Sequence, residues 1–108
     1  MAVKIIIRRR VPKEKESELL PLLVEMRSKA TAQPGYISGE TLRNVGDPED
    51  YVVISTWQSE ETWKAWASSK DRIQIQEKID ALLGAATDYG IYFYGQFFRQ
   101  ALVSQQKP

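Results

Sequence analysis

All three tryptophans of the chain, Trp57, Trp63 and Trp66, fall within ten positions of one another. An indole combines a large apolar surface with one N–H donor that needs a partner when it is buried. Trp63 and Trp66 are three residues apart, so they are neighbours on one face if this stretch is helical. Aromatic residues at that spacing are more often core than ligand contacts, but a pocket wall would also use the ring as apolar surface and the N–H as an orienting donor. The pattern therefore leaves two interpretations, a packed core and a small-molecule pocket.

The sequence lacks the side chains on which several kinds of chemistry depend. It contains no cysteine and no histidine, which removes thiolate nucleophiles, thiolate metal sites, the commonest general base and the commonest metal ligand. Ser69 followed by Lys70 is a weak match to a serine–lysine pair. Gly35, Gly39 and Gly46 have none of the spacings of a phosphate-binding loop. Acyl transfer and nucleotide chemistry are therefore not supported.

Two charged stretches have simple structural interpretations. Asp47, Glu49 and Asp50 lie close together, as is typical of a turn rather than of a calcium or magnesium site. The consecutive arginines from Arg8 to Arg10 come at the end of a predicted strand, where such residues usually form a solvated rim and only sometimes an anion site. With a net charge of +1, nucleic acid is not expected as a partner.

The composition is that of one globular domain. The chain has 108 residues, of which 43% are hydrophobic and 27% charged, close to the averages for globular proteins. No apolar run approaches the roughly 20 residues of a membrane-spanning helix. The N-terminus has no signal-peptide pattern, so we expect a cytoplasmic protein with no membrane partner.

Hydrophobic periodicity and turn residues predict the order strand, helix, strand, strand, two helices, strand. The expected ranges are 3–10, 13–31, 36–44, 50–57, 59–67, 69–83 and 88–99. Pro21 falls inside the first helix, so either Ser17 caps the regular part or the helix begins near Lys13 and kinks. The sequence leaves both alternatives open.

Capping residues mark the ends of the later helices. Ser59, followed by Glu60 and Glu61, is a good N-cap with acidic residues in the first turn. Ser69 or Asp71 can cap the next helix. Its buried stripe is expected to include Ile75, Ile79 and Leu82, with Gly84 as its stop.

This order of elements predicts an α+β, ferredoxin-like split β-α-β protomer, in which helices cover one face of an antiparallel four-stranded sheet. Apolar residues nevertheless fall on both faces of the strands. Val52 and Ile54 point opposite to Tyr51, Val53 and Trp57, and the last strand divides Tyr92, Tyr94 and Phe98 from Tyr89, Ile91, Phe93 and Phe97. Because helices are available for one face only, we expect a second copy to cover the other face in a two-fold homodimer.

The stretch from Pro34 to Gln76 resembles the antibiotic biosynthesis monooxygenase (ABM) domain of the dimeric α+β barrel superfamily. The marks are Pro34-Gly35 before the second strand, Asp47-Pro48 in the hairpin, Trp57-x-Ser59 at the end of the third strand, and Trp66 followed by Ser69. The likeness extends over about residues 2 to 96. It implies a dimer formed by sheet packing and a ligand cavity between sheet and helices.

The resemblance also implies two kinds of activity. Members oxygenate aromatic polyketides with O₂ and without metal or flavin, and another branch degrades heme with an asparagine, a tryptophan and an iron-binding histidine. Trp66 stands at the tryptophan position of the heme branch, Gln76 at its histidine position, and Arg9 near its asparagine position. Because glutamine is a poor axial ligand, the resemblance disfavours heme degradation.

The resulting hypothesis is a cofactor-independent monooxygenase acting on a small aromatic or quinone-like substrate. Trp66, Gln76, Arg9 and Trp63 are the expected substrate contacts, Trp57 is expected to be structural, and no catalytic residue is assigned. The alternative is a non-catalytic dimeric domain that binds a small molecule or serves in a stress response. The domain is expected to cover residues 1–99, followed by a tail of residues 100–108.

Overall fold

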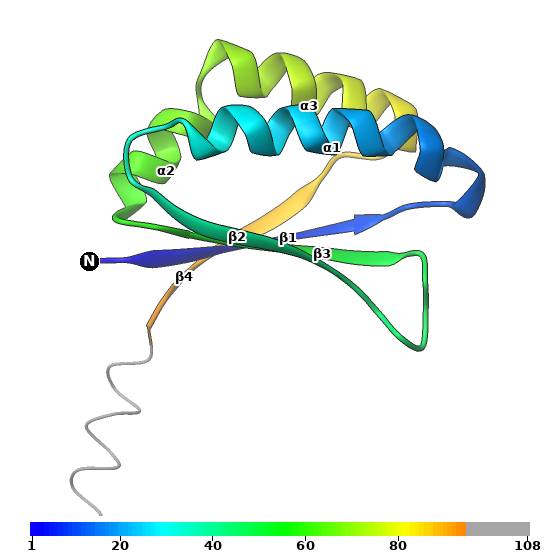
Figure 1. The fold of residues 1–108 in the computed structure, drawn as a ribbon, viewed down its shortest axis with the longest axis horizontal. Helices are drawn as coiled ribbons and strands as arrows, with labels where there is room; N and C mark the ends of the chain where they lie inside the picture. The colour runs from blue at the N-terminus through cyan, green and yellow to red at the C-terminus, as the bar shows by residue number, and fades with distance from the viewer. Residues whose placement is uncertain (95–108) are drawn as a thin grey trace, which may run out of the picture.

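In a computed structural model that describes residues 1–94, four strands form one antiparallel sheet and all helices lie on one side of it (Figure 1). The elements are β1 (Val3–Arg10), the 3₁₀ turn η1 (Lys13–Lys15), α1 (Glu16–Thr31), β2 (Tyr36–Arg43), β3 (Asp50–Trp57), α2 (Glu60–Ala67), α3 (Lys70–Leu83) and β4 (Asp88–Phe93). The strand order is β2-β3-β1-β4. The predicted ferredoxin-like α+β fold is therefore confirmed.

The beginning of α1 decides between the two alternatives for Pro21. The helix is regular from Glu16 to Thr31 with Pro21 inside it, and Ser17 lies within the first turn instead of capping it. Lys15 occupies the N-cap position without a side-chain cap, because η1 leads directly into the helix. The Ser17 cap was wrong, and the helical segment begins near Lys13.

The predicted N-caps of α2 and α3 are confirmed. The Ser59 hydroxyl accepts a hydrogen bond from the Thr62 backbone N–H, and the Thr62 hydroxyl reaches back to the N–H of Ser59, which completes a capping box. Ser69, and not Asp71, caps α3 through the Arg72 N–H. Gly84 ends α3 in the left-handed conformation that glycine adopts most easily.

The sheet has one covered face and one open face. On the covered face, Val3, Ile5, Ile7 and Arg9 of β1 are all buried. On the open face, no helix of the described part of the chain lies over Val52 and Ile54 of β3 (Figure 1). Further apolar side chains of that face are exposed, including Leu42 (47%), Tyr92 (52%) and Tyr94 (51%). The predicted two-faced apolar pattern is confirmed, while Phe97 and Phe98 lie outside the described residues.

The last strand is shorter than predicted within the described range. The strand β4 ends at Phe93, and Tyr94 follows without regular structure. The remainder of the predicted strand and the tail fall outside residues 1–94. No helix in the described part of the chain is long and apolar enough to cross a membrane.

The core between helices and sheet consists of two clusters at opposite ends of the molecule. The tryptophan-end cluster contains Val3, Ile5, Ile7, Ala30, Trp57, Trp63 and Trp66. The hairpin-end cluster contains Val11, Leu19, Tyr51, Ile75 and Ile79. The first includes Trp63 and Trp66 of α2, and the second includes Tyr51, which follows the β2–β3 hairpin. Arg9 of β1 stands between Ile7 of one cluster and Val11 of the other.

Candidate functional site

A cavity of about 70 Å³ lies between the covered face of the sheet and the helices, and the tryptophan-end cluster borders it. Its walls come from β1, α1, β2, β3, α2 and the first turn of α3. Trp57, Trp63 and Trp66 all line it, and each is almost fully buried. The same rings therefore pack the core and wall the cavity, and their role as ligand contacts stays a prediction.

Aromatic rings in edge-to-face contact cross the covered face of the sheet. Tyr36 packs against Trp57 at 5.4 Å, Trp57 against Trp63 at 5.7 Å, and Trp63 against Tyr89 at 5.6 Å between ring centroids. This arrangement is the favoured one for aromatic quadrupoles. Trp66 lies outside this row and contributes a separate part of the wall.

At two glycines near the cavity, a Cβ atom would collide with a neighbouring side chain. Gly35 has φ of 88°, and a Cβ there would come within 2.4 Å of Thr62, so only glycine lets the turn before β2 pack on the start of α2. A Cβ at Gly39 would meet the Tyr36 hydroxyl at 2.6 Å. The glycine at this position therefore lets the Tyr36 ring lie along β2 at the edge of the cavity.

The indole N–H groups differ in their partners. The Trp57 Nε1–H donates to the Ser55 hydroxyl at 3.1 Å. The Trp63 Nε1 is buried and has no hydrogen-bond acceptor among residues 1–94. A buried donor without an acceptor is costly, and this one belongs to a residue that lines the cavity.

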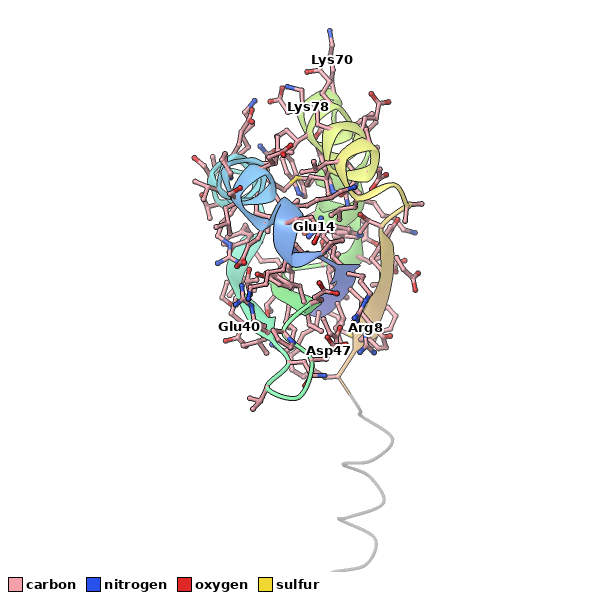
Figure 2. All side chains as sticks on the ribbon, turned by 90° about the vertical axis from the view of Figure 1, so that its right-hand side faces the viewer. Arg8, Glu14, Glu40, Asp47, Lys70 and Lys78 are labelled. Carbon is pink, nitrogen blue, oxygen red and sulfur yellow. The ribbon has the colours of Figure 1, made fainter. Side chains whose placement is uncertain are left out.

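Arg9 is the first of two guanidinium groups in the cavity wall. Only 7% of Arg9 is exposed, whereas its neighbours Arg8 and Arg10 are exposed and pair with carboxylates near the hairpin. Figure 2 shows Arg8 and Asp47 on the side of the molecule away from the helices. The solvated-rim interpretation was wrong for Arg9, because the two-residue period of the strand turns it to the same face as Ile5 and Ile7.

Arg9 has few partners for a buried cation. Its Nη2 donates to the Gln76 Oε1 at 3.2 Å, and its Nε has no acceptor among the described residues. Burial and the like charge of Arg72 lower the pKa of Arg9 to about 10, and Asp80 opposes part of that shift. Arg9 therefore still carries its positive charge at neutral pH.

Arg72 is the second guanidinium, and the sequence reasoning missed it. It is also only 7% exposed and lines the same cavity. Its guanidinium lies over the rings of Trp63 and Tyr89, at 5.1 and 5.8 Å from their centroids. Burial lowers its pKa, while Tyr89 and Asp80 act in the opposite direction.

A signal for Arg72 was present in the sequence. It precedes Ile75 and Ile79 by three and seven positions, so it belongs to the buried stripe of α3. Lys70 and Lys78 of the same helix point away from the sheet in Figure 2 and are exposed. The helical period therefore separates the inward arginine from the outward lysines.

Gln76 lies behind Arg9 and does not line the cavity. Its amide nitrogen donates to the Asp80 carboxylate at 2.8 Å and to the Thr87 hydroxyl. Asp80 in turn accepts hydrogen bonds from the Thr87 backbone N–H and hydroxyl. Of the four predicted contacts, the structure places Trp66, Trp63 and Arg9 at the cavity, and Gln76 as the residue that orients Arg9.

The rim of the cavity is formed by Arg27 of α1 and Thr41 of β2. The Arg27 Nη2 donates to the Thr41 hydroxyl at 2.8 Å, and this contact is exposed. A cavity that binds benzene measures about 150 Å³, which is larger than the cavity in this structure. An aromatic ligand therefore requires side chains at the rim to move.

Comparison with known proteins shows the family to which the chain with this cavity belongs. The family model of antibiotic biosynthesis monooxygenases matches residues 2–78. The chain belongs to this family. In this monooxygenase-family member, the matched range includes every residue of the cavity wall described above.

Solved structures share the fold of this monooxygenase-family protein. A conserved protein of Methanosarcina mazei superposes with a TM-score of 0.78 at 20% identity, covering 85% of this chain and 91% of the other. A single-residue mutant of SnoaB, a cofactor-independent oxygenase of Streptomyces nogalater, gives 0.77 at 17% identity, covering 87% and 93%. Both confirm the fold.

A curated relative matches a shorter stretch. Protein SchA of Streptomyces halstedii is 25% identical over 65 residues, which are 60% of this chain and 17% of that protein. The family member therefore spans about a sixth of the length of this relative.

Among residues 1–94, no group of three or more His, Cys, Asp or Glu side chains is arranged to hold a metal ion. Asp47 and Glu49 bind Arg10 instead, as a turn interpretation predicts.

Proposed function

We propose that this protein is a cofactor-independent monooxygenase that oxidises a small aromatic or quinone-like substrate in the cavity. The observation that carries the proposal is a cavity walled by three tryptophans and two buried guanidinium groups. The rings offer flat apolar surfaces, and the charges favour an electron-rich anion over its neutral acid. The description of SnoaB as a cofactor-independent oxygenase supports this class of reaction.

The reaction balances without an added reductant when the substrate supplies all the electrons. For a methylene group between electron-rich rings, R₂CH₂ and O₂ give R₂C=O and H₂O, with four electrons passing from carbon to oxygen. The substrate first loses a proton to form an enolate or phenolate that can reduce O₂. Arg9 and Arg72 would lower the pKa of the bound acid, and the buried walls would keep water from the reacting atoms.

Oxygen uptake tests the proposal directly. The purified chain, treated with a chelator, is mixed with anthrone, whose methylene is acidic, and O₂ is followed with an electrode. We expect uptake above the spontaneous rate, with about one O₂ consumed per ketone formed. In Trp66→Ala we expect a rate lower by roughly 100-fold, since misplacing a substrate by about 1 Å has that effect. Equal rates in the two proteins would remove Trp66 from the mechanism.

A matched control separates substrate placement from general loosening of the fold. Ile79 is as deeply buried as Trp66 but belongs to the hairpin-end cluster, away from the cavity. Ile79→Ala should therefore retain turnover at temperatures where it stays folded. If the chain quenches tryptophan fluorescence saturably with aromatic compounds but consumes no O₂ with any of them, the binding-domain alternative replaces the monooxygenase.

The open face of the sheet also supports a two-fold homodimer as the working form. Its apolar side chains, including Val52, Ile54, Leu42 and Tyr92, form a surface that a copy of itself would cover. In sedimentation at micromolar concentration we expect a dimer, and Ile54→Glu should give a monomer. Ile73→Glu is the control, because Ile73 is an exposed isoleucine of α3. A monomeric wild type would overturn the dimer.

A further inference from the structure

We infer that Arg9 and Arg72 form a binding site for a carboxylate, so that the ligand of this cavity is an aromatic acid bound as its monoanion. This inference rests on the proposed function only in placing the ligand in the same cavity. The inference adds that the ligand itself carries a carboxylate. This charge is separate from the enolate or phenolate that would form during the proposed reaction.

The first step in the argument is the charge of the cavity. Both guanidiniums line it, both are 7% exposed, and neither forms an ion pair with a carboxylate of the described chain. Asp80 is the acidic residue that acts electrostatically on both. Two positive charges and one negative charge leave a net charge of +1, which one carboxylate would neutralise.

The second step is the number of unused donors. A guanidinium has five N–H groups. Among residues 1–94 the Arg9 guanidinium makes one hydrogen bond, to Gln76, and its Nε is buried without an acceptor. The Arg72 guanidinium makes one long hydrogen bond of 3.5 Å, to the Ala67 carbonyl. The buried Nε1 of Trp63 is a further donor without an acceptor.

The third step is the match between these donors and a planar acid. A guanidinium binds a carboxylate through two parallel N–H···O bonds. The Trp63 ring beside Arg72, and the Trp57 ring elsewhere in the wall, offer apolar surface to an attached aromatic ring. Gln76, held by Asp80 and Thr87, accepts a hydrogen bond from one arm of the Arg9 guanidinium, and the buried Arg9 Nε has no acceptor among the described residues. The cavity wall therefore combines arginine side chains that have few partners with aromatic rings.

Two exposed arginines of the same protein are paired with carboxylates within residues 1–94, unlike Arg9 and Arg72. Arg10 pairs with Asp47 and Glu49, and Arg43 pairs with Glu16. These arginines are solvent-exposed and still have carboxylate partners. Arg9 and Arg72, which cannot be fully hydrated, have none within the described chain, so a ligand carboxylate supplies the missing partner.

Benzoate and benzamide test the inference as a matched pair, because they have nearly the same shape and differ in charge. Binding to the wild-type chain is measured by calorimetry and by quenching of tryptophan fluorescence. We expect benzoate to bind about 10- to 100-fold more tightly than benzamide, the range for hydrogen bonds to charged groups. Equal affinity for the two compounds would overturn the inference without any variant being made.

Three glutamine variants locate the carboxylate. Arg9→Gln and Arg72→Gln should each lose the preference for benzoate, while Arg10→Gln, from the same strand but on the open face, should keep it. An equal loss in Arg10→Gln would overturn the inference, since it would indicate a general effect of net charge. Because both inward variants remove a buried charge, we expect them to fold, as circular dichroism will show.

The outcomes separate this inference from the proposed function. Selective benzoate binding with no O₂ uptake from any substrate would remove the monooxygenase and leave the carboxylate site. Turnover of neutral substrates with no preference for their carboxylated analogues would remove the carboxylate site and leave the monooxygenase.

Discussion

The two ends of the core both consist of buried apolar side chains, but they differ in whether their buried polar atoms have hydrogen-bond partners. At the hairpin end, the hydroxyl of the buried residue Tyr51 donates to Glu16 at 2.8 Å and accepts from Arg43. At the tryptophan end, the buried Trp63 Nε1 has no acceptor among residues 1–94, and neither does the Nε of Arg9, which lies between the two clusters. Buried polar groups in a purely structural core are nearly always satisfied. The Tyr51 hydroxyl at the hairpin end is thus paired within the chain, whereas the unpaired donors belong to Trp63 and Arg9, two residues of the cavity in which we propose ligand binding.

Truncating a buried side chain should lower the free energy of unfolding more at the hairpin end than at the tryptophan end. Ile79 is fully buried among aliphatic neighbours, so Ile79→Ala should lower the free energy of unfolding by about 2–5 kcal/mol. Urea unfolding followed by circular dichroism measures this, and benzoate affinity should stay unchanged below the transition. Trp66→Ala is the comparison, because the Trp66 ring borders a cavity on one side. A cost for Trp66→Ala of ~3–5 kcal/mol, the range for core aromatics, would make Trp66 an ordinary core residue.

Removing an inward charge should raise stability while it removes ligand binding. Arg9→Met keeps an unbranched side chain and eliminates a buried cation that lies near Arg72. We expect the free energy of unfolding to rise by roughly 1–4 kcal/mol, as when buried ionic groups are replaced by apolar ones, and benzoate binding to disappear. Arg43→Met at the hairpin end should not stabilise the protein, because Arg43 is exposed and paired. Destabilisation by Arg9→Met would instead show that Arg9 is a structural residue.

Removing the Arg27 side chain at the rim of the cavity should change the association rate of benzoate more than its dissociation constant. Arg27→Ala removes the exposed contact to Thr41 at the edge of the cavity. We expect faster association of benzoate in stopped-flow fluorescence, with a dissociation constant changed by no more than about twofold, because Arg27 does not touch the proposed carboxylate. Lys29→Ala, an exposed change on the same helix, serves as the control. An unchanged association rate would place the entrance elsewhere.

The satisfied network at the hairpin end should contribute a small, pH-dependent stabilisation. Hydrogen bonds from Tyr51 and Arg43 lower the pKa of Glu16. Since the folded-state pKa lies below the unfolded one, the stabilisation is present above the ordinary glutamate pKa of about 4.3 and is lost as the pH falls through the lowered value. Between about pH 6 and pH 3, wild type should lose slightly more stability in urea unfolding than Glu16→Gln. A greater loss in Glu16→Gln would contradict this assignment.

Most of the fold could be predicted from the sequence because its signals are local. Ser59, Ser69 and Gly84 mark helix ends through hydrogen bonds and backbone conformations that span only a few residues. The start of α1 was less certain, since a proline inside a helix is compatible with more than one N-terminus. The beginning at η1 depends on how the chain leaves β1, which is a tertiary property.

The candidate site could be predicted only in part. Trp66, Trp63 and Arg9 were identified from spacing and resemblance, and the structure brings them to one cavity. Arg72 was missed, although its place in the stripe with Ile75 and Ile79 was visible. An arginine in a buried stripe is usually taken for a surface residue at its edge, and nothing local shows that it lies over Trp63.

The sequence by itself determined the order of strands and helices, the two-faced apolar pattern of the sheet and the absence of histidine and cysteine. These follow from residue type and period, which need no knowledge of distant contacts. Only the tertiary structure decided that Arg9 and Arg72 share one cavity and that Gln76 holds Arg9 from behind. These residues are up to 67 positions apart, and their meeting depends on the packing of α3 against β1, which no local pattern specifies.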